Sequence, residues 1–271
     1  MTDKKIVLIT GAGAGLGEAM ARRFAVDGWQ IIVADLDLER AEAVAAELGG
    51  AAHALAMNVV EEADWERVRN EVEARFGHLD VLVNNAGVAV GGTLEETSIE
   101  DWRWVMDIDL LGVVMGCKAF APMMRRRGRG HIINVASYAG FAAAPGINAY
   151  GTAKAAVIAM SEMLRAELKS AGVEVSVLCP AFVKTRLTET MRAPDPSYSE
   201  RVQRWMANSG VSAEDVAGVV ARAVARPRFL LLTHGNTRWM WRIKRWLPET
   251  YFRLLMRGVA KMEAKARNRR S

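Results

Sequence analysis

A tyrosine and a lysine stand four residues apart in NAYGTAKAAV, residues 148–157. In a helix of about 3.6 residues per turn, Tyr150 and Lys154 share a face and their side chains can meet. A free phenol has a pKa near 10, too high for an efficient base at neutral pH, and a cation within roughly 4–6 Å favours the phenolate. The pair could therefore move protons, although Tyr and Lys also meet at this spacing on ordinary helix surfaces.

A glycine-rich loop follows the apolar run KIVLIT in the stretch TGAGAGLGEAMARRFA. Gly11, Gly15 and Gly17 would let the backbone approach a pyrophosphate, and the N-terminus of the following helix supplies N–H groups and partial positive charge. The alternative is that they only form a tight strand–helix turn. Their position after an apolar strand, with a carboxylate at the end of the next strand, favours dinucleotide binding.

That carboxylate is Asp35 in IIVADLD. An acidic residue at this position accepts hydrogen bonds from the adenosine ribose hydroxyls and repels a 2′-phosphate. Leu36 follows where an arginine could stand, and Ala14 occupies a loop position where a basic residue could hold a phosphate. We therefore predict NAD(H) in preference to NADP(H). The alternative role for Asp35 is to cap the N-terminus of the next helix.

The elements that must position these residues alternate along the chain. Short runs rich in Val, Ile and Leu are separated by longer helical patterns, which indicates a parallel sheet covered on both faces. Gly28, Gly77 and Gly172 are placed to end helices before the next strand. The chain is predicted to form one doubly wound, Rossmann-type α/β domain over residues 1–235, followed by a basic helical tail over 236–271.

Over roughly residues 4–235, the chain resembles the short-chain dehydrogenases/reductases. TGAGAGLG resembles the cofactor motif of that family, NNAG at 84–87 resembles the motif that ends strand four, and CPAFVKT resembles the Pro-Gly motif after strand six. Ser137 in INVAS, with Tyr150 and Lys154, matches the catalytic residues of the family. The joint match in the family order is specific, whereas each motif alone is not.

The resemblance implies a role for each of these residues. Tyr150 would be the general acid/base on the substrate oxygen, Ser137 would orient that oxygen, and Lys154 would bind the nicotinamide ribose and lower the pKa of the tyrosine. Hydride chemistry would reside in the cofactor, so no metal is expected. The expected cofactor contacts, besides Tyr150 and Lys154, are Gly11, Gly15, Leu16, Gly17, Asp35, Leu36, Asn58, Val59, Asn85, Ala86, Gly87, Pro180, Val183 and Thr185.

Three positions depart from the family pattern. Ala181 stands where glycine is usual after strand six, and Asn58 replaces an aspartate near the adenine, where its side-chain oxygen can still accept a hydrogen bond. Asp109, in WVMDIDLLGVV, replaces the asparagine that is the fourth catalytic residue of the family. The resemblance implies that this residue acts through its main-chain carbonyl, which holds a water linked to the lysine. A backbone carbonyl survives the exchange of Asn for Asp, so activity need not be lost.

The side chain of Asp109 carries a different consequence. A carboxylate near Lys154 would offset the ammonium charge and make the phenolate form of Tyr150 less favourable. We therefore hypothesise that alcohol oxidation by this protein needs a more alkaline pH than is usual in the family.

The substrate side is expected to include the segment at about 186–212, which corresponds to the variable substrate loop of the family. Pro194 and Pro196 would break helices and flank two short amphipathic pieces, as in a mobile lid. The surroundings are mostly apolar and lack clustered arginines, which favours a hydrophobic secondary alcohol or ketone; simple core packing is the alternative. The candidate substrate contacts are Ser137, Tyr150, Phe141, Phe182 and Met191.

The favoured function is an NAD(H)-dependent oxidoreductase that interconverts a hydrophobic secondary alcohol and a ketone. A second hypothesis is a catalytically impaired dinucleotide-binding protein with a regulatory or scaffold role, for which Asp109 is the one argument. A third is non-redox chemistry at the Ser–Tyr pair, against which the glycine loop and Asp35 count. The resemblance also implies a homodimer or homotetramer.

Composition adds limits on location and partners. Cys117 and Cys179 fall in apolar segments without CxxC spacing and are expected to be reduced thiols in a cytoplasmic protein. The first ten residues pass too quickly from charge to a short apolar run to be a signal peptide, and no run reaches the ~18 apolar residues of a membrane span.

The net charge of +5 is unevenly distributed. Residues 236–271 hold eleven Lys/Arg against two Glu, a net charge of +9, which leaves −4 on the rest of the chain. The apolar residues of this tail follow helical spacing, and Pro248 separates two expected helices. The tail is expected to pack on the body, close the substrate pocket or form a subunit contact. Peripheral binding to an anionic membrane surface is the second alternative, and nucleic acid is the least favoured partner.

Overall fold

The computed structural model describes residues 4–267 and, within that range, all side chains except those of residues 262, 263 and 265–267. A parallel sheet forms the centre of the fold. The strands follow the spatial order β3-β2-β1-β4-β5-β6-β7, and every pairing is parallel. This confirms the predicted doubly wound Rossmann-type fold. The strands are β1 (Ile6–Thr10), β2 (Gln30–Asp35), β3 (Ala52–Ala56), β4 (Val81–Asn84), β5 (Gly130–Val135), β6 (Val173–Cys179) and β7 (Leu230–Leu232).

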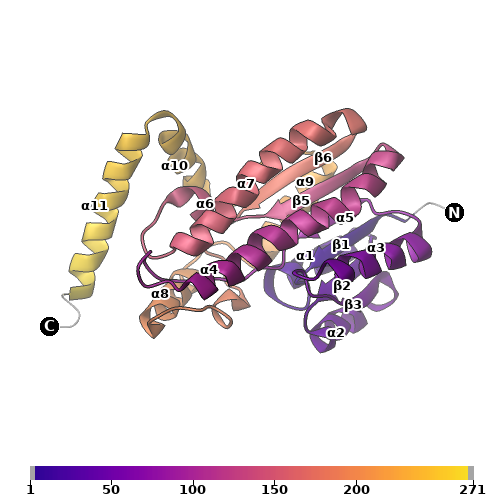
Figure 1. The fold of residues 1–271 in the computed structure, drawn as a ribbon, viewed down its shortest axis with the longest axis horizontal. Helices are drawn as coiled ribbons and strands as arrows, with labels where there is room; N and C mark the ends of the chain where they lie inside the picture. The colour runs from indigo at the N-terminus through magenta and orange to yellow at the C-terminus, as the bar shows by residue number, and fades with distance from the viewer. Residues whose placement is uncertain (1–3, 268–271) are drawn as a thin grey trace. The chain divides into compact units, whose positions relative to one another are not determined.

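Helices cover both faces of this sheet, as the buried strands require. Helices α3, α5 and α7 pack on one face, while α1 and α9 lie side by side on the other (Figure 1). The helices of this part of the chain are α1 (Gly15–Val26), α2 (Leu38–Leu48), α3 (Glu62–Phe76), α4 (Ile99–Met106), α5 (Gly112–Arg127), α6 (Ala139–Ala142), α7 (Asn148–Leu168), α8 (Pro196–Ala207) and α9 (Ala213–Ala225). Short 3-10 turns occupy Gly49–Ala51, Lys169–Ala171 and Arg186–Thr188.

The carboxyl ends of the strands lie at one edge of the sheet, because all the strands run in the same direction. From β1 the chain continues to β2 and β3 on one side, whereas β4 lies on the other side of β1. Crevices at such reversals of strand order are the usual ligand sites of open α/β sheets. The glycine loop after β1, the NNAG turn after β4, and Ser137 after β5 all lie at this edge.

A π turn interrupts the long helix that the sequence predicts near 98–127. Asp107–Leu111 forms this turn between α4 and α5. Single π turns inside α-helices are frequent at functional sites, since the extra residue redirects the side chains around it. The redirected side chain here is that of Asp109, which is fully buried.

The segment 186–212 contains two short helical pieces, the 3-10 turn Arg186–Thr188 and α8, and the two prolines stand where the second piece begins. Pro196 is the first residue of α8, and the Asp195 carboxylate caps that helix by accepting from the Ser197 N–H at 2.6 Å. Pro196 therefore separates the two pieces by beginning a helix rather than by ending one, because proline fits the first helical turn, where its missing N–H has no partner to lose.

The chain divides into two compact units, a first unit up to Thr233 and a second unit from His234 onward. The second unit consists of α10 (Gly235–Trp246) and α11 (Pro248–Arg267), which pack against each other. The Lys244 ammonium lies 5.9 Å from the ring centre of Tyr251, across the turn at Pro248. Among the described residues, no helix has the length and apolar character needed to cross a membrane.

Candidate active site

Helix α7 carries Tyr150 and Lys154 on one face, as the four-residue spacing predicts. The Lys154 ammonium lies 5.8 Å from the ring centre of Tyr150, and the Ser137 hydroxyl forms a hydrogen bond with Tyr150. Ser137 precedes α6, and its Oγ accepts from the Ala139 N–H at 3.1 Å. Gly140 permits the close packing of α6 on α7, because a Cβ there would lie 2.8 Å from the Lys154 carbonyl carbon. The structure thus brings the three predicted catalytic residues together.

Asp109 forms a buried ion pair with Lys154. Its Oδ2 lies 3.1 Å from Nζ, and the two side chains are 0% and 4% exposed. Asp109 Oδ1 accepts from the Val88 N–H at 2.8 Å, and Lys154 Nζ donates to the Val135 carbonyl at 3.1 Å. Gly87 makes room for this pair, since a Cβ there would lie 3.1 Å from Asp109 Oδ1. The carboxylate therefore joins the π turn to the lysine and to the NNAG turn.

These charges act on one another across a site from which water is largely removed. Burial raises the pKa of Tyr150; the Lys154 cation opposes that rise, and the Asp109 carboxylate adds to it. Burial lowers the pKa of Lys154, but the charges of Asp109 and Tyr150 reverse that effect and leave the pKa raised. The arrangement keeps the ammonium charged and favours the neutral phenol of Tyr150 when no cofactor charge is present.

The glycine loop and the NNAG turn are held together by hydrogen bonds. The Thr10 hydroxyl accepts from the N–H groups of Asn85 and Ala86, both at 3.0 Å, and Asn85 Nδ2 donates to the carbonyls of Thr10 and Gly11. Gly11 has a φ of +63°, and a Cβ there would lie 2.9 Å from Ala86 Cα, so only glycine fits. Thr10 lies outside the predicted set of site residues, although it belongs to the quoted motif.

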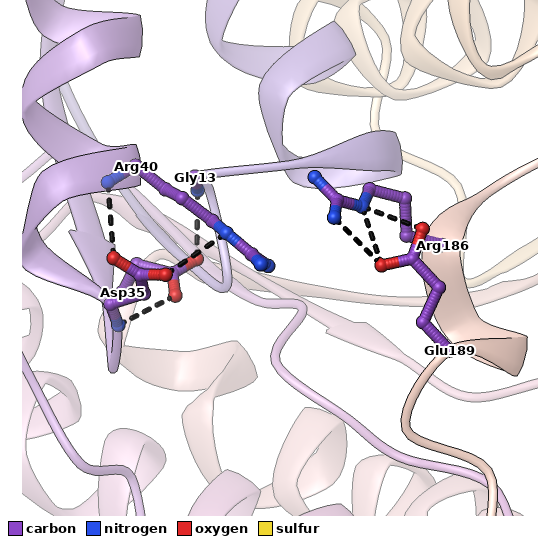
Figure 2. A network of polar contacts seen from close by, with 6 residues as sticks. Gly13, Asp35, Arg40, Arg186 and Glu189 are labelled. Atoms are coloured by element: carbon purple, nitrogen blue, oxygen red, sulfur yellow. Dashed lines mark hydrogen bonds and ion pairs between the residues drawn. The ribbon is translucent and has the colours of Figure 1, made fainter.

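Asp35 is oriented by backbone donors at the end of β2. Its Oδ2 accepts from the Gly13 N–H at 2.8 Å and its Oδ1 from the Asp37 N–H at 3.1 Å (Figure 2). The cap of α2 is Asp37, which accepts from the Arg40 N–H, so the alternative that Asp35 caps this helix is wrong. The carboxylate sits two residues too early to reach the free N–H groups of the first helical turn.

Arg40 was not singled out from the sequence, yet it lies beside this carboxylate. Its Nε is 2.9 Å from Asp37 Oδ2, and its Cβ lies 2.8 Å from the position that a Cβ on Gly13 would occupy. Arg186, in the 3-10 turn Arg186–Thr188, forms an ion pair with Glu189 at 2.7 Å (Figure 2). Two guanidinium groups thus flank this end of the site, each held by a neighbouring carboxylate.

The residues present fit a bound dinucleotide. Gly11 and Gly15 adopt positive φ angles, and Cβ atoms at Gly11, Gly13 or Gly17 would collide with neighbouring atoms, so the loop presents backbone to the crevice. Thr185 approaches Gly15 from the opposite side. Asn58 Oδ1 accepts from the Val60 N–H at 3.3 Å and keeps a second lone pair for a ligand donor. Val59 and Val183 are buried, whereas Leu36 is exposed.

A buried polar network holds α7 on the sheet. Asn84 Nδ2 donates to Asn134 Oδ1 at 2.8 Å, and Asn134 Nδ2 donates to the Ser161 hydroxyl at 3.0 Å. The network joins β4, β5 and α7, which carries Tyr150 and Lys154. Cys117 borders it, and burial raises the pKa of this thiol to about 12. Both cysteines are buried free thiols, as predicted. The described residues contain no cluster of three or more His, Cys, Asp or Glu side chains suited to a metal ion.

The segment 186–212, here called the substrate segment because the sequence predicts that it contacts substrate, is fastened to α4 through Arg192. Its backbone forms a bridge with the 89–91 strand-like segment, where the Arg192 N–H donates to the Ala89 carbonyl at 3.1 Å. Its guanidinium lies 3.3 Å from an Asp101 carboxylate oxygen and 3.9 Å from the ring centre of Trp104. Trp104 and Tyr150 both pack on the apolar cluster around Val105. Arg192 therefore connects the segment to the apolar cluster on which Tyr150 packs.

A second fastening involves Tyr198 on α8. Its hydroxyl donates to Glu96 at 2.8 Å, and its ring packs over Gly91 and Gly146. Arg192 and Asp101 are 91 residues apart in the sequence, and Tyr198 and Glu96 are 102 residues apart. Because of this separation, no local sequence pattern predicts either contact.

The three apolar residues predicted to contact substrate have different partners. The Phe141 ring packs edge-on against Tyr138, with ring centres 4.8 Å apart. Phe182 is partly exposed and lies against Trp205 of α8 at 5.0 Å. Met191 packs at Gly91. Phe182 thus contacts α8, and Met191 contacts the 89–91 segment. The partner of Phe141, in contrast, lies in the loop after Ser137.

Comparison with known proteins identifies the family. The short chain dehydrogenase family model matches residues 5–196. The chain is 38% identical over 220 residues to meso-2,3-butanediol dehydrogenase from Serratia marcescens, covering 81% of this chain and 86% of that protein. It is 32% identical over 256 residues to the probable oxidoreductase EphD from Mycobacterium tuberculosis, covering 90% of this chain but only 43% of that protein.

A solved structure shares both the fold and the sequence pattern. It is a short-chain dehydrogenase/reductase from Burkholderia phymatum in complex with NAD, with a TM-score of 0.86 and 32% identity, covering 92% of this chain and 95% of that one. The extent of the family match, together with these relatives, shows that this chain is an oxidoreductase of the short-chain dehydrogenase/reductase family.

Proposed function

We propose that the protein is an NAD(H)-dependent dehydrogenase that interconverts a hydrophobic secondary alcohol and the corresponding ketone. One observation carries the proposal: Ser137, Tyr150 and Lys154 converge at the sheet edge that also holds the glycine loop and Asp35. Residues 1–235 would form the catalytic domain, and a homodimer or homotetramer is the assembly proposed from the family.

Tyr150 would transfer the proton. In ketone reduction, its hydroxyl donates to the substrate oxygen, and in alcohol oxidation the phenolate accepts the hydroxyl proton. The Ser137 hydroxyl orients the same oxygen by a hydrogen bond. Lys154 stabilises negative charge on Tyr150 and would hold the nicotinamide ribose. The nicotinamide supplies the hydride chemistry when it is bound.

Asp35 would select the cofactor. Its carboxylate is held by two backbone N–H groups, and its remaining lone pairs are available for ribose hydroxyls. A 2′-phosphate would meet this negative charge at short range, which supports NAD(H) over NADP(H). Arg40 lies beside Asp35, but its guanidinium is engaged by Asp37, so the local charge around the ribose position is balanced by carboxylates.

The proposed substrate class rests on the side chains around the segment 186–212. Phe182, Trp205 and Met191 provide apolar surface, and the name of the Serratia relative refers to a secondary alcohol. The ion pairs of this segment join Arg186 to Glu189 and Arg192 to Asp101, which leaves these two arginines poorly suited to clamp an acidic substrate.

The test combines cofactor binding with a substrate panel. Purified protein is titrated with NADH and with NADPH while the nicotinamide fluorescence is followed, and turnover of aliphatic, alicyclic and aromatic ketones is then measured. We expect NADH to bind more tightly and at least one hydrophobic ketone to be reduced. Tyr150→Phe should retain NADH binding and lose ~10²–10⁴-fold in kcat.

The outcomes separate the alternatives. Tight NADH binding without turnover of any ketone or alcohol would favour the dinucleotide-binding regulatory protein, for which the buried Asp109–Lys154 pair is the specific observation. Better efficiency with NADPH would contradict the cofactor assignment alone. Turnover that survives Tyr150→Phe would contradict the proposed role of the tyrosine.

A further inference from the structure

Exposed apolar side chains are concentrated in the second unit. Of the fifteen large hydrophobic residues that are exposed in the described part of the chain, six lie between Trp239 and Met256. The other nine are spread from Val26 to Trp205. Scattered exposed apolar residues are normal on a protein surface, whereas a cluster marks an interaction site. Five of these six residues, here called the aromatic face, are Trp239, Trp246, Leu247, Phe252 and Met256. The sixth, Leu254, lies roughly 160° around α11 from both Phe252 and Met256.

Exposed apolar residues gather on one stripe of each helix of this unit, whereas Trp241 and Leu254 lie outside these stripes. With ~100° per residue, Trp239 and Trp246 fall on one stripe of α10. In α11, Phe252 and Met256 lie along one side, while Arg253 and Arg257 lie along another. This pattern, with aromatic residues on one face and Lys/Arg on the other, is typical of helices that lie in the interface of a lipid bilayer.

The cations stand beside the aromatic rings and reach solvent. The Arg242 guanidinium is 5.4 Å from the ring centre of Trp239, and that of Arg245 is 5.6 Å from that of Trp241. Long basic side chains can lie along apolar surface while their charged ends stay in the aqueous headgroup layer. Tryptophan is likewise suited to the boundary between water and hydrocarbon, because its ring is apolar and its N–H is polar.

Net charge identifies the occupant of this face. Residues 236–271 carry +9, and Glu249 is the one acidic residue among the described side chains of α10 and α11. We propose that the second unit binds the surface of an anionic lipid bilayer, with α10 and α11 lying in the interfacial plane. Neither helix is apolar enough to cross the bilayer, so the contact is peripheral. The proposal does not depend on the reaction that the first unit catalyses.

The test is cosedimentation of the full-length protein with vesicles. One set contains phosphatidylcholine alone, and the other contains phosphatidylcholine with phosphatidylglycerol; each is measured at low and high salt. We expect binding to the anionic vesicles at low salt and a strong decrease at high salt, because surface charge is screened within about one Debye length. Absence of binding to the anionic vesicles would overturn the proposal, as would equal binding to both sets.

Variants separate the contributions of the two faces. The triple variant Trp239→Ala, Trp246→Ala, Phe252→Ala should weaken binding by at least ~100-fold, since three aromatic contacts with the interface are lost. Arg253→Gln with Arg257→Gln should weaken it by about tenfold or more. Val26→Ala, at an exposed apolar residue of the first unit, is the matched control and should bind as the wild type does. Circular dichroism checks that each variant is folded.

Association between copies is the competing use of the aromatic face. Sedimentation velocity without lipid measures the mass of the wild type and of the triple variant. If the triple variant halves the mass while lipid binding is unchanged, the face joins two copies and the membrane proposal is wrong. Unchanged mass together with lost vesicle binding supports the proposal, and ketone turnover without vesicles should be the same in both proteins.

Discussion

The proposed catalytic centre and the segment 186–212 both contain ion pairs, but in different surroundings. Asp109 and Lys154 meet at 3.1 Å with almost no exposure to solvent. Arg192 and Asp101 meet at 3.3 Å with side chains 42% and 28% exposed. A buried pair is costly to break, because the remaining charge has no water to solvate it, whereas an exposed pair contributes only about 0–1 kcal/mol. The buried ion pair is therefore costly to break, whereas the exposed ion pair contributes little to the stability of its region.

The backbone reinforces this difference. Tyr150 and Lys154 stand on a long helix that the Asn84–Asn134–Ser161 network joins to two buried strands. The substrate segment meets the 89–91 region through hydrogen bonds at one isolated bridge and through exposed side chains. Segments with few buried contacts open at lower free energy than the core. We therefore expect the segment to open while the catalytic centre stays assembled.

The largest expected effect tests the buried pair. Asp109→Ala should lower the free energy of unfolding by ~3–5 kcal/mol, because the Lys154 charge would remain buried without its partner. Asp101→Ala, which removes the partner of an exposed pair, should lower it by less than ~1 kcal/mol. Urea denaturation followed by circular dichroism measures both. Equal losses in the two variants would remove the distinction between the regions.

The next effect concerns the edge of the sheet where the cofactor is proposed to bind. There, two backbone N–H groups hold the Asp35 carboxylate. Asp35→Asn should raise the NADPH/NADH ratio of kcat/KM by roughly tenfold or more, because the charge that repels a 2′-phosphate is gone. Asp37→Asn keeps Asp35 and serves as the control. A ratio that moves more in the control than in Asp35→Asn would assign the selectivity to the wrong carboxylate.

A third prediction concerns the effect of the buried Asp109 carboxylate on the pH dependence of alcohol oxidation. The groups whose charges act on Tyr150 are Lys154 from its own helix, Asp109 from the π turn and the Cys179 thiol from β6. Lys154 lowers the pKa of the tyrosine, whereas Asp109 raises it. Asp109→Asn removes the second effect, so the pKa of Tyr150 should fall and the rise in alcohol oxidation should move to lower pH.

The pH–rate profile of kcat/KM for oxidation measures this shift, with the reduction profile as a companion. The hypothesis of an alkaline requirement is wrong if the two proteins have the same oxidation profile. Asp109→Asn also tests position independently of charge, since the amide can still accept from the Val88 N–H.

The smallest expected effect concerns the fastening of the substrate segment. Arg192→Gln removes the contacts with Asp101 and Trp104 and should raise KM a few-fold with little change in kcat, a loss of about 0.5–1 kcal/mol. Limited proteolysis should cut the variant faster within 186–212. Arg126→Gln removes another exposed ion pair of the first unit, with Glu73, and is the matched control. Equal protease sensitivity in the two variants would contradict the role of Arg192.

Much of the fold could be predicted because its pattern is local. Buried strands read as continuous apolar runs, and glycines or Pro248 stand where helices end or begin. The convergence of Ser137, Tyr150 and Lys154 was also predictable, from motif order. Pro196 was expected to separate two helical pieces, and it does so as the first residue of α8, where the Asp195 cap begins the helix.

Residues distant in sequence could not be predicted. The contacts of Arg192 with Asp101 and Trp104, and of Tyr198 with Glu96, join positions that no local periodicity relates. Arg40 stands only five residues after Asp35, but its contact with Gly13 in the glycine loop forms only when α2 packs beside that loop. These residues surround the crevice without belonging to any short motif.

By itself, the sequence determined the alternating elements, the helical face shared by Tyr150 and Lys154, and the uneven charge of the two parts of the chain, since each depends on residue type and spacing along one segment. Only the tertiary structure decided which charges meet. Asp109 faces Lys154 because a π turn aims one buried side chain at another helix, and Arg192 meets Trp104 because the substrate segment folds back onto α4. Electrostatic effects depend on distance and burial, and both are properties of packed elements rather than of the sequence order.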